Sequence, residues 1–113
     1  MSSDCLFCRI VRKEIPANLA AEDEHSLAFH DIGPQAPTHI LVIPKQHVAS
    51  LNEVTDHGML GRLFSMAARI ASDAGFADQG YRTVINTNDD GGQTVHHLHL
   101  HILAGRRMKW PPG

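Results

Sequence analysis

Residues 97–103 read His-Leu-His-Leu-His-Ile-Leu, so histidine alternates strictly with aliphatic residues. Alternation at period two predicts a β-strand with one apolar face and one imidazole face. Because a strand rises about 3.3 Å per residue, His97, His99 and His101 are expected on one side at intervals of about 6.6 Å. The aliphatic residues between them then face the layer on which the strand packs.

A turn rich in glycine lies shortly before this strand. Residues 88–92 read Asn-Asp-Asp-Gly-Gly, in which Asn and Asp tolerate left-handed backbone conformations and glycine adopts them freely. Such a turn presents free backbone N–H groups, which bind anions. Three imidazoles beside it therefore indicate a site for an anionic substrate.

Two kinds of chemistry suit three histidines in this arrangement. A purely structural role is disfavoured, because each buried imidazole needs a hydrogen-bond partner. In the first chemistry, neutral imidazoles bind zinc, for which His-x-His on a strand suffices when a third ligand arrives from elsewhere. In the second, the central imidazole attacks phosphorus as a nucleophile, while its neighbours orient it and handle protons. The pattern alone leaves both open.

Two cysteines lie near the start of the chain. Residues 4–13 have helical spacing of apolar residues, and Asp4 is a suitable N-cap. Cys5 and Cys8 are three residues apart and share one face of this short predicted helix. A Cys-x-x-Cys pair alone does not distinguish zinc binding, redox chemistry and coincidence, although no thioredoxin-like βαβ pattern surrounds it. Two histidines from distant positions could complete a tetrahedral zinc site.

The rest of the chain predicts further strands and one long helix. Short alternations at residues 18–22 and 26–30 indicate a hairpin. Residues 39–43 are apolar on both faces, which predicts a central strand, and residues 81–86 lead up to the glycine turn. The long helix covers residues 56–74, ends at Gly75 and carries an apolar stripe that is core or a subunit interface. The stripe consists of Met59, Leu60, Leu63, Phe64, Ala67, Ile70, Ala71 and Ala74.

The order of these elements predicts one α+β domain over residues 1–113. Its sheet is mostly antiparallel with about five strands, and it has one long and one short helix. With a net charge of -2, the chain lacks the excess of positive charge that is typical of nucleic-acid-binding proteins. No apolar run approaches the roughly 20 residues that cross a bilayer. The first residues lack the features of a signal peptide, so we expect a cytoplasmic protein with reduced cysteines and neither a nucleic-acid nor a membrane partner.

With these residues in view, the chain resembles the histidine triad (HIT) family of nucleotide hydrolases and transferases. Residues 97–103 match the signature His-φ-His-φ-His-φ-φ, where φ is an apolar residue. Other stretches resemble the Hint branch of this family in particular, and together they span nearly the whole chain in order. They are residues 29–32, 34–39, 42–45, 90–93 and the Trp-Pro-Pro-Gly end at residues 110–113.

The resemblance implies a HIT-like fold and a homodimer in which two sheets join into one extended sheet. The C-terminal tail, residues 106–113, is then expected at the dimer interface or the active site. The implied activity is that of a purine nucleoside phosphoramidase acting on adenosine 5′-phosphoramidates and aminoacyl-adenylate-like compounds. The intermediate would be a nucleotide bound covalently to a histidine.

The resemblance also implies roles for individual residues. His99 would be the nucleophile, and His97 would orient it. His101 and His39 would contact the phosphate and help the leaving amine depart. An imidazole with the ordinary pKa of about 6.5 is largely neutral at neutral pH, so this chemistry needs no unusual pKa.

The nucleotide is expected to contact a second group of residues. Asp31 would bind the ribose hydroxyls, because a carboxylate accepts hydrogen bonds from both, and Ile32 would lie at the base pocket. The residues expected around the phosphate, besides His99 and His101, are Asn86, Gly92, Gln93 and Thr94.

Some HIT proteins bind zinc through two cysteines and two histidines, and the resemblance implies such a site here. Its ligands would be Cys5, Cys8, His47 and His97, and the zinc would be structural. Other members lack the cysteines, so catalysis is expected to need no cofactor. His96 is a departure from the Hint pattern and is expected to point away from the site. The alternatives are a metal-dependent hydrolase with the triad as ligands, and a nucleotide-binding regulatory module with little turnover.

Overall fold

The computed structural model describes residues 5–113, and the proposed cap Asp4 lies outside them. The five strands form one sheet in the order β1-β2-β3-β5-β4, and every neighbouring pair is antiparallel. This confirms the predicted α+β class. In chain order the elements are α1 (Leu6–Val11), β1 (Leu19–Glu22), β2 (Ser26–His30), β3 (Thr38–Pro44), the 3₁₀ turn η1 (Leu51–Glu53), α2 (His57–Ala74), β4 (Arg82–Val84), α3 (Asn88–Gly91) and β5 (Leu100–Ala104).

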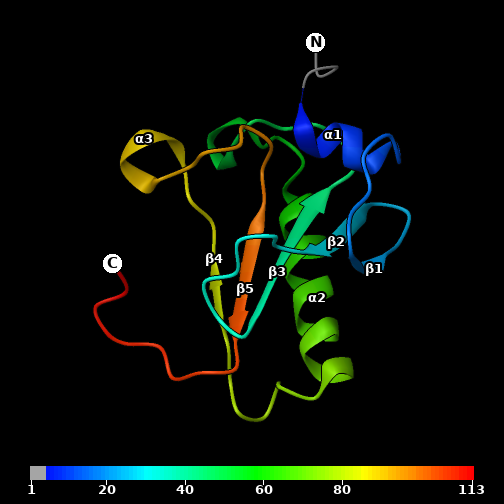
Figure 1. Cartoon of the computed structure of the whole chain (residues 1–113). Coiled ribbons are helices and arrows are strands. Elements are labelled where there is room, and N and C mark those ends of the chain that lie inside the picture. The colour runs from blue at the N-terminus through cyan, green and yellow to red at the C-terminus, as the bar shows by residue number, and fades with distance from the viewer. Residues whose placement is uncertain (1–4) are drawn as a thin grey trace.

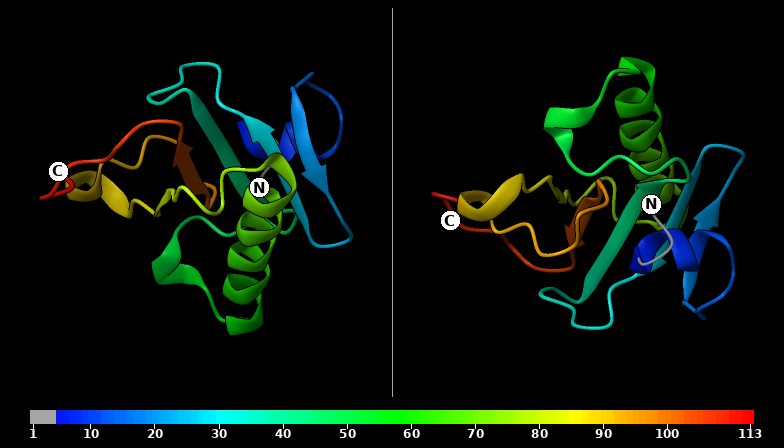
Figure 2. Two further views of the ribbon diagram at one scale, coloured as in Figure 1. Left: turned by 90° about the horizontal axis from the view of Figure 1, so that it is seen from below. Right: turned by 90° about the horizontal axis from the view of Figure 1, so that it is seen from above.

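The central strand β3 lies between α2 on one face of the sheet and α1 on the other (Figures 1 and 2). α2 covers one face of the sheet, where it packs on residues such as Val42 and Ile102. α1 lies on the other face, where Phe7 and Ile10 pack on residues such as Leu41. A strand with both faces covered must be apolar throughout, which explains the continuous hydrophobic run that predicted it.

α2 begins and ends where the sequence predicted. Asp56 caps it by accepting a hydrogen bond from the Gly58 N–H at 3.1 Å, and Gly75 ends it with a φ of 87°. The predicted stripe is largely the core, but Phe64 is 45% exposed and Ala74 is exposed. The buried residues of α2 are Met59, Leu63, Met66, Ala67, Ile70 and Ala71.

α1 is shorter than the predicted helix at residues 4–13. Its N-cap is Cys5, whose Sγ accepts a hydrogen bond from the Cys8 N–H at 3.4 Å. The helix ends at Val11, and Lys13 has a φ of 63°, so the chain leaves the helix before Pro16. The two cysteines do share one face of α1, as predicted.

The histidine strand is also shorter than predicted. β5 begins at Leu100, whose pair with Val42 is the last one between β5 and β3, and the edge strand β4 ends one residue later at the pair of Val84 and His101. Residues before Leu100 have no edge strand beside them, and the Leu98 N–H instead donates to the Val48 carbonyl at 2.7 Å. The alternation of side-chain direction nevertheless continues through this segment. Leu98, Leu100 and Ile102 pack on the α2 face, whereas the three histidines lie on the α1 face.

Two further differences concern the segment between α2 and β5. β4 covers only Arg82–Val84, whereas residues 81–86 were predicted, and the glycine turn contains the four-residue helix α3. Such a helix is too short to produce a periodic pattern. Of the two glycines, Gly92 has a positive φ, 80°, and ends α3. Among the described residues, no helix is both long and apolar enough to span a bilayer.

Candidate active site

A cavity of about 320 Å³ lies between α1 and the sheet, and the triad opens into it. His99 and His101 line one side, and the loop after β2 contributes Asp31 and Ile32. α1 forms an apolar wall opposite the triad, with Leu6, Phe7 and Ile10. The cavity thus combines imidazoles, one carboxylate and apolar side chains, a mixture typical of sites for small molecules.

His99 is held so that one ring nitrogen is available for chemistry. Its Nδ1 lies 2.7 Å from the backbone carbonyl of His97, so Nδ1 carries the hydrogen and donates it. Nε2 then holds a lone pair. The ring of Phe7 packs edge to face on this imidazole, with centroids 5.2 Å apart. His99 is only 7% exposed and therefore has a fixed orientation.

His39 and His101 form a directed pair. The Gln35 N–H donates to His39 Nδ1 at 3.0 Å, so the hydrogen of a neutral His39 is on Nε2. This Nε2–H lies 2.9 Å from His101 Nδ1 and donates to it. His101 consequently carries its own hydrogen on Nε2, a buried atom for which the described residues offer no acceptor. A buried donor without a partner beside a cavity indicates the place of a ligand oxygen or nitrogen.

Burial keeps the histidines of the site neutral. It lowers the pKa of His99, and it lowers the pKa of His39 against the opposing effect of the Asp31 carboxylate. Burial, together with the neighbouring His99 and His39, lowers the pKa of His101 to about 4. At neutral pH, each ring therefore has one N–H and one lone pair, as nucleophilic attack and proton transfer require.

Of the residues expected at the nucleotide, some line the cavity and others do not. Asp31 lines the cavity, and its Oδ1 accepts a hydrogen bond from the Gly33 N–H at 2.8 Å. Ile32 beside it is fully exposed, and Thr94 also lines the cavity. Asn86 and Gly92 do not line it.

Gln93, which was expected beside the phosphate, is buried, and its side-chain hydrogen bonds are made within the protein. Its Oε1 accepts from the Asn88 N–H, and its Nε2 donates to the carbonyls of Ala49 and Val95. The side-chain amide is therefore engaged in holding the loop between α3 and the triad. No sequence pattern predicts this role, because one of its partners, the Ala49 carbonyl, lies 44 residues away and all three are backbone groups.

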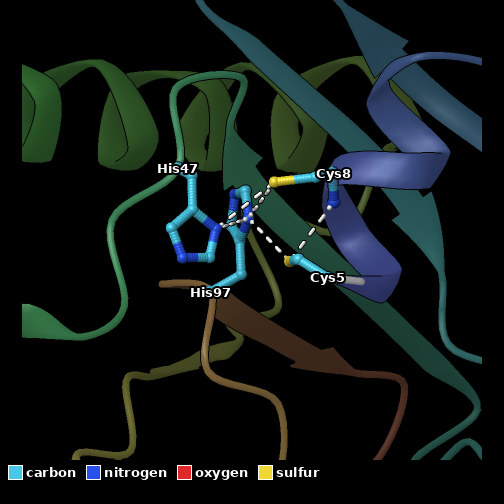
Figure 3. Close-up of side chains that lie close together, drawn as sticks. All are labelled: Cys5, Cys8, His47 and His97. Atoms are coloured by element: carbon cyan, nitrogen blue, oxygen red, sulfur yellow. Dashed lines mark hydrogen bonds between the residues drawn. The ribbon is translucent and has the colours of Figure 1, made fainter. Parts of the chain in front are cut away.

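Cys5, Cys8, His47 and His97 converge on one point, although they come from three separate parts of the chain (Figure 3). Their ligand atoms all lie within 4.8 Å of one another. His97 Nδ1 is 3.4 Å from Cys5 Sγ, 3.5 Å from Cys8 Sγ and 3.2 Å from His47 Nδ1. The Cys8 sulfur is 3.3 Å from His47 Nδ1. We refer to these four residues as the Cys–His cluster.

The Cys–His cluster fits a zinc ion in geometry and in protonation. Four ligands at the usual zinc distances of about 2.0–2.3 Å, arranged as a tetrahedron, are separated by about 3.3–3.8 Å. His97 Nε2 lies 2.8 Å from the Pro44 carbonyl and donates to it, which leaves the lone pair of Nδ1 directed at the two sulfurs. A His97 with the opposite tautomer could not be a ligand through this atom.

The structure divides the triad among three environments. His97 belongs to the Cys–His cluster, His101 pairs with His39, and His99 lies between them. A second group with metal-ligand spacing consists of Asp31, His39 and His101. Because the two groups share no residue and neither contains His99, the three histidines do not converge on one ion.

The sequence patterns did not predict the part that α1 takes in the site. Phe7 contacts the rings of both His97 and His99, and Leu6 and Ile10 line the cavity. The only sequence signal for this was the position of Leu6 and Phe7 between the two cysteines. If the cysteines join His97 at one centre, the residues between them must lie near the triad.

Comparison with known proteins identifies the family. The model of the HIT domain family matches residues 12–108. The purine nucleoside phosphoramidase of Escherichia coli is 46% identical over 110 residues, which cover 96% of this chain and 92% of that protein. An uncharacterized HIT-like protein of Synechococcus elongatus is 55% identical over 115 residues and is covered completely, as is this chain.

Solved structures agree with the sequence comparison. The crystal structure of a HIT family hydrolase from Legionella pneumophila matches with a TM-score of 0.94 and 51% identity, covering 97% of this chain and 100% of that one. A histidine triad protein from Clostridium difficile matches with a TM-score of 0.91 and 44% identity, covering 95% of both chains. The cavity of this chain has a lone pair on His99 and a proton donor on His101 beside it. The family model and these relatives show that the chain belongs to the HIT family and is a hydrolase.

Proposed function

We propose that this hydrolase is a purine nucleoside phosphoramidase, which cleaves the P–N bond of adenosine 5′-phosphoramidates and of aminoacyl-adenylate-like compounds. The observation that carries the proposal is the pairing of His99 Nε2, which holds a lone pair, with the unpartnered N–H of His101 beside the same cavity. The first attacks phosphorus and the second protonates an amine. The 46% identity to the E. coli purine nucleoside phosphoramidase supports this substrate class.

The first step transfers the nucleotide to the protein. His99 Nε2 forms a bond to phosphorus as the P–N bond breaks. The leaving nitrogen takes the hydrogen of His101 Nε2, because an amine anion is too basic to depart unprotonated. His101 then regains a hydrogen at Nδ1 across its 2.9 Å contact with His39, and His39 takes up one proton from solvent, so that neither ring is left as an imidazolate anion. The electrons of the P–N bond leave with the neutral amine.

The second step releases the nucleotide by hydrolysis. Water attacks phosphorus, the bond to His99 Nε2 breaks, and AMP is the product. The water loses its proton to the pair of His101 and His39, which now acts as the base and passes the proton back to solvent. In both steps the His97 carbonyl keeps the His99 ring in place through its 2.7 Å hydrogen bond.

The remaining cavity residues fit a purine nucleoside. The Asp31 carboxylate accepts hydrogen bonds from the two ribose hydroxyls. Ile32 and the apolar wall of α1 bind the base, while the phosphate lies against His99, His101 and Thr94. Gly92 and Gln93 act on the phosphate site indirectly, because they shape the loop that carries Thr94.

We also propose that the Cys–His cluster holds a structural zinc ion, which joins three separate segments of the chain. Thiolate ligands persist in a reducing compartment, so the cluster is consistent with a cytoplasmic protein. We further propose a homodimer that extends the sheet through β4, since β4 is an edge strand and the nearby Trp110 is 82% exposed. A monomeric mass in solution would contradict the dimer.

Hydrolysis of adenosine 5′-phosphoramidate by the purified protein tests the function. At saturating substrate, we expect turnover to remain within about threefold of its original value after zinc is removed by a chelator, because no step needs a metal. Circular dichroism verifies that the treated protein is folded. Turnover that disappears with the metal and returns with it, in protein that stays folded, would favour the metal-dependent hydrolase instead.

The pH dependence of kcat/KM is expected to lack an acid limb near the ordinary histidine pKa of about 6.5. kcat/KM reports the free enzyme, in which burial lowers the pKa of His39 and lowers that of His101 to about 4. Both rings therefore stay neutral as the pH falls through 6.5, and activity is lost only closer to the lowered values. A profile from about pH 8 to pH 5 measures this. A limb centred near 6.5 would show that the two rings are more hydrated than their burial indicates.

A further inference from the structure

The helix α1 takes part in two sites at once. Cys5, its N-cap, and Cys8 belong to the Cys–His cluster (Figure 3). Leu6, Phe7 and Ile10 form the apolar wall of the cavity. The cysteines and the wall residues all lie on a single helix of six residues and its cap. Any displacement of the cysteines must therefore displace the wall as well.

Side chains make the contacts that attach α1 to the rest of the molecule: Phe7 and Ile10 pack on the sheet, and the sulfurs of Cys5 and Cys8 contact His97 and His47. The backbone hydrogen bonds of residues 5–14 given by the structure remain within that segment. A helix of six residues is far below the length of about 12–15 residues at which isolated helices become marginally stable. Phe7 and Ile10 pack on the sheet, whereas Leu6 is 46% exposed. A metal ion bound by Cys5 and Cys8 would add two strong bonds at the start of this helix.

His97, by contrast, is held from several directions. Its side chain is fully buried, its Nε2 donates to the Pro44 carbonyl at 2.8 Å, and it lies three residues before β5. Its backbone carbonyl, which orients His99, therefore has support that is independent of the cluster. Loss of the metal would then affect the position of α1 more than the position of His99.

From this asymmetry we propose that metal binding at the Cys–His cluster positions α1 as the wall of the nucleoside pocket, so that Cys5 and Cys8 control nucleotide affinity. Cys5 and Cys8 are thus positioning residues for substrate binding. The proposal rests on the proposed function, because it takes the cavity to be the nucleotide site. It goes beyond structural stabilisation, since it assigns the effect of the metal to KM and leaves kcat nearly unchanged.

The test compares zinc-loaded protein with protein whose cluster is impaired. His47→Asn removes one exposed ligand, and His57→Asn is the matched control, because His57 is an equally exposed histidine in the first turn of α2. Zinc content, AMP affinity by calorimetry, and KM and kcat are measured for both variants. Amide hydrogen exchange of residues 8–12 reports α1 directly. Chelator-treated wild-type protein, with and without added zinc, provides a second route to the metal-free state.

For the metal-free protein, we expect Kd for AMP and KM to rise about tenfold or more, with kcat within about threefold. Exchange in α1 should accelerate, and added zinc should restore all these values in the wild type. His57→Asn should keep its zinc and its AMP affinity. Unchanged AMP affinity and KM in metal-free protein would overturn the proposal, as would a fall in kcat with KM constant.

A further variant keeps the test decisive if the loss of a ligand prevents folding. Leu6→Ala shortens the pocket wall at a half-exposed position and leaves the ligands untouched, so it should bind one zinc and show weaker AMP binding. AMP affinity equal to that of the wild type would overturn the assignment of α1 as the wall. Failure of the proposed function has a different signature, because zinc-loaded wild-type protein would then neither bind AMP nor hydrolyse the phosphoramidate.

Discussion

Replacing His99 by alanine is expected to lower the turnover of adenosine 5′-phosphoramidate by at least about 10⁴-fold, since loss of an enzyme nucleophile has effects of this order. The expectation follows from the different partners of the three triad histidines in the structure. His97 Nδ1 faces two sulfurs and His101 Nδ1 accepts from His39. His99 is the member whose free lone pair lies beside the cavity. Steady-state hydrolysis with purified protein measures the loss.

Two controls separate the loss of the nucleophile from damage to the fold. His96→Ala removes an exposed histidine three residues away and should leave turnover within about twofold. His99→Ala should still bind AMP, because the cavity and Asp31 remain. Acid-quenched wild-type protein should contain a nucleotide bound to histidine, and the variant should not. Tight AMP binding with negligible turnover, equal in wild type and variant, would instead indicate a nucleotide-binding module.

The sequence predicted the direction of the histidines better than their secondary structure. Alternation at period two placed His97, His99 and His101 on one side, although β5 begins only at Leu100. The alternating direction of the side chains persists through residues 97–99, whereas a strand also needs a hydrogen-bonded neighbour. Pairing with β3 ends at Leu100 and pairing with β4 ends at His101, and the positions of these ends are not encoded in residues 97–103.

The partners of the site residues could not be predicted, because they are backbone groups or come from distant parts of the chain. The tautomers of His97 and His39 depend on the Pro44 carbonyl and the Gln35 N–H, which are backbone groups without a sequence signal. The contact of Phe7 with two triad rings likewise requires the fold. The resemblance to the HIT family supplied the residue set, and the structure supplied the donor and acceptor at each atom.

Those donors and acceptors lead to a second large expected effect. His101→Gln and His39→Gln should each lower kcat about 10²–10⁴-fold for a phosphoramidate, the usual contribution of a positioned general acid. Glutamine keeps a donor and an acceptor at each position but cannot release one proton while taking up another. AMP affinity should therefore change much less than kcat, and His96→Gln should leave both unchanged.

The leaving group determines whether this interpretation is correct. If His101 protonates the departing nitrogen, an AMP ester of nitrophenol, whose phenolate departs without a proton, should lose far less activity in either variant than the phosphoramidate does. The double variant, with both His39→Gln and His101→Gln, should be no slower than the slower single variant. Both residues belong to one proton-transfer path, so either substitution alone already removes its function and the two effects do not add. Equal losses for both leaving groups would mean that His101 stabilises the charge on phosphorus instead. In that case the hydrogen bond from His39 Nε2 to His101 Nδ1 orients the ring and does not carry the proton.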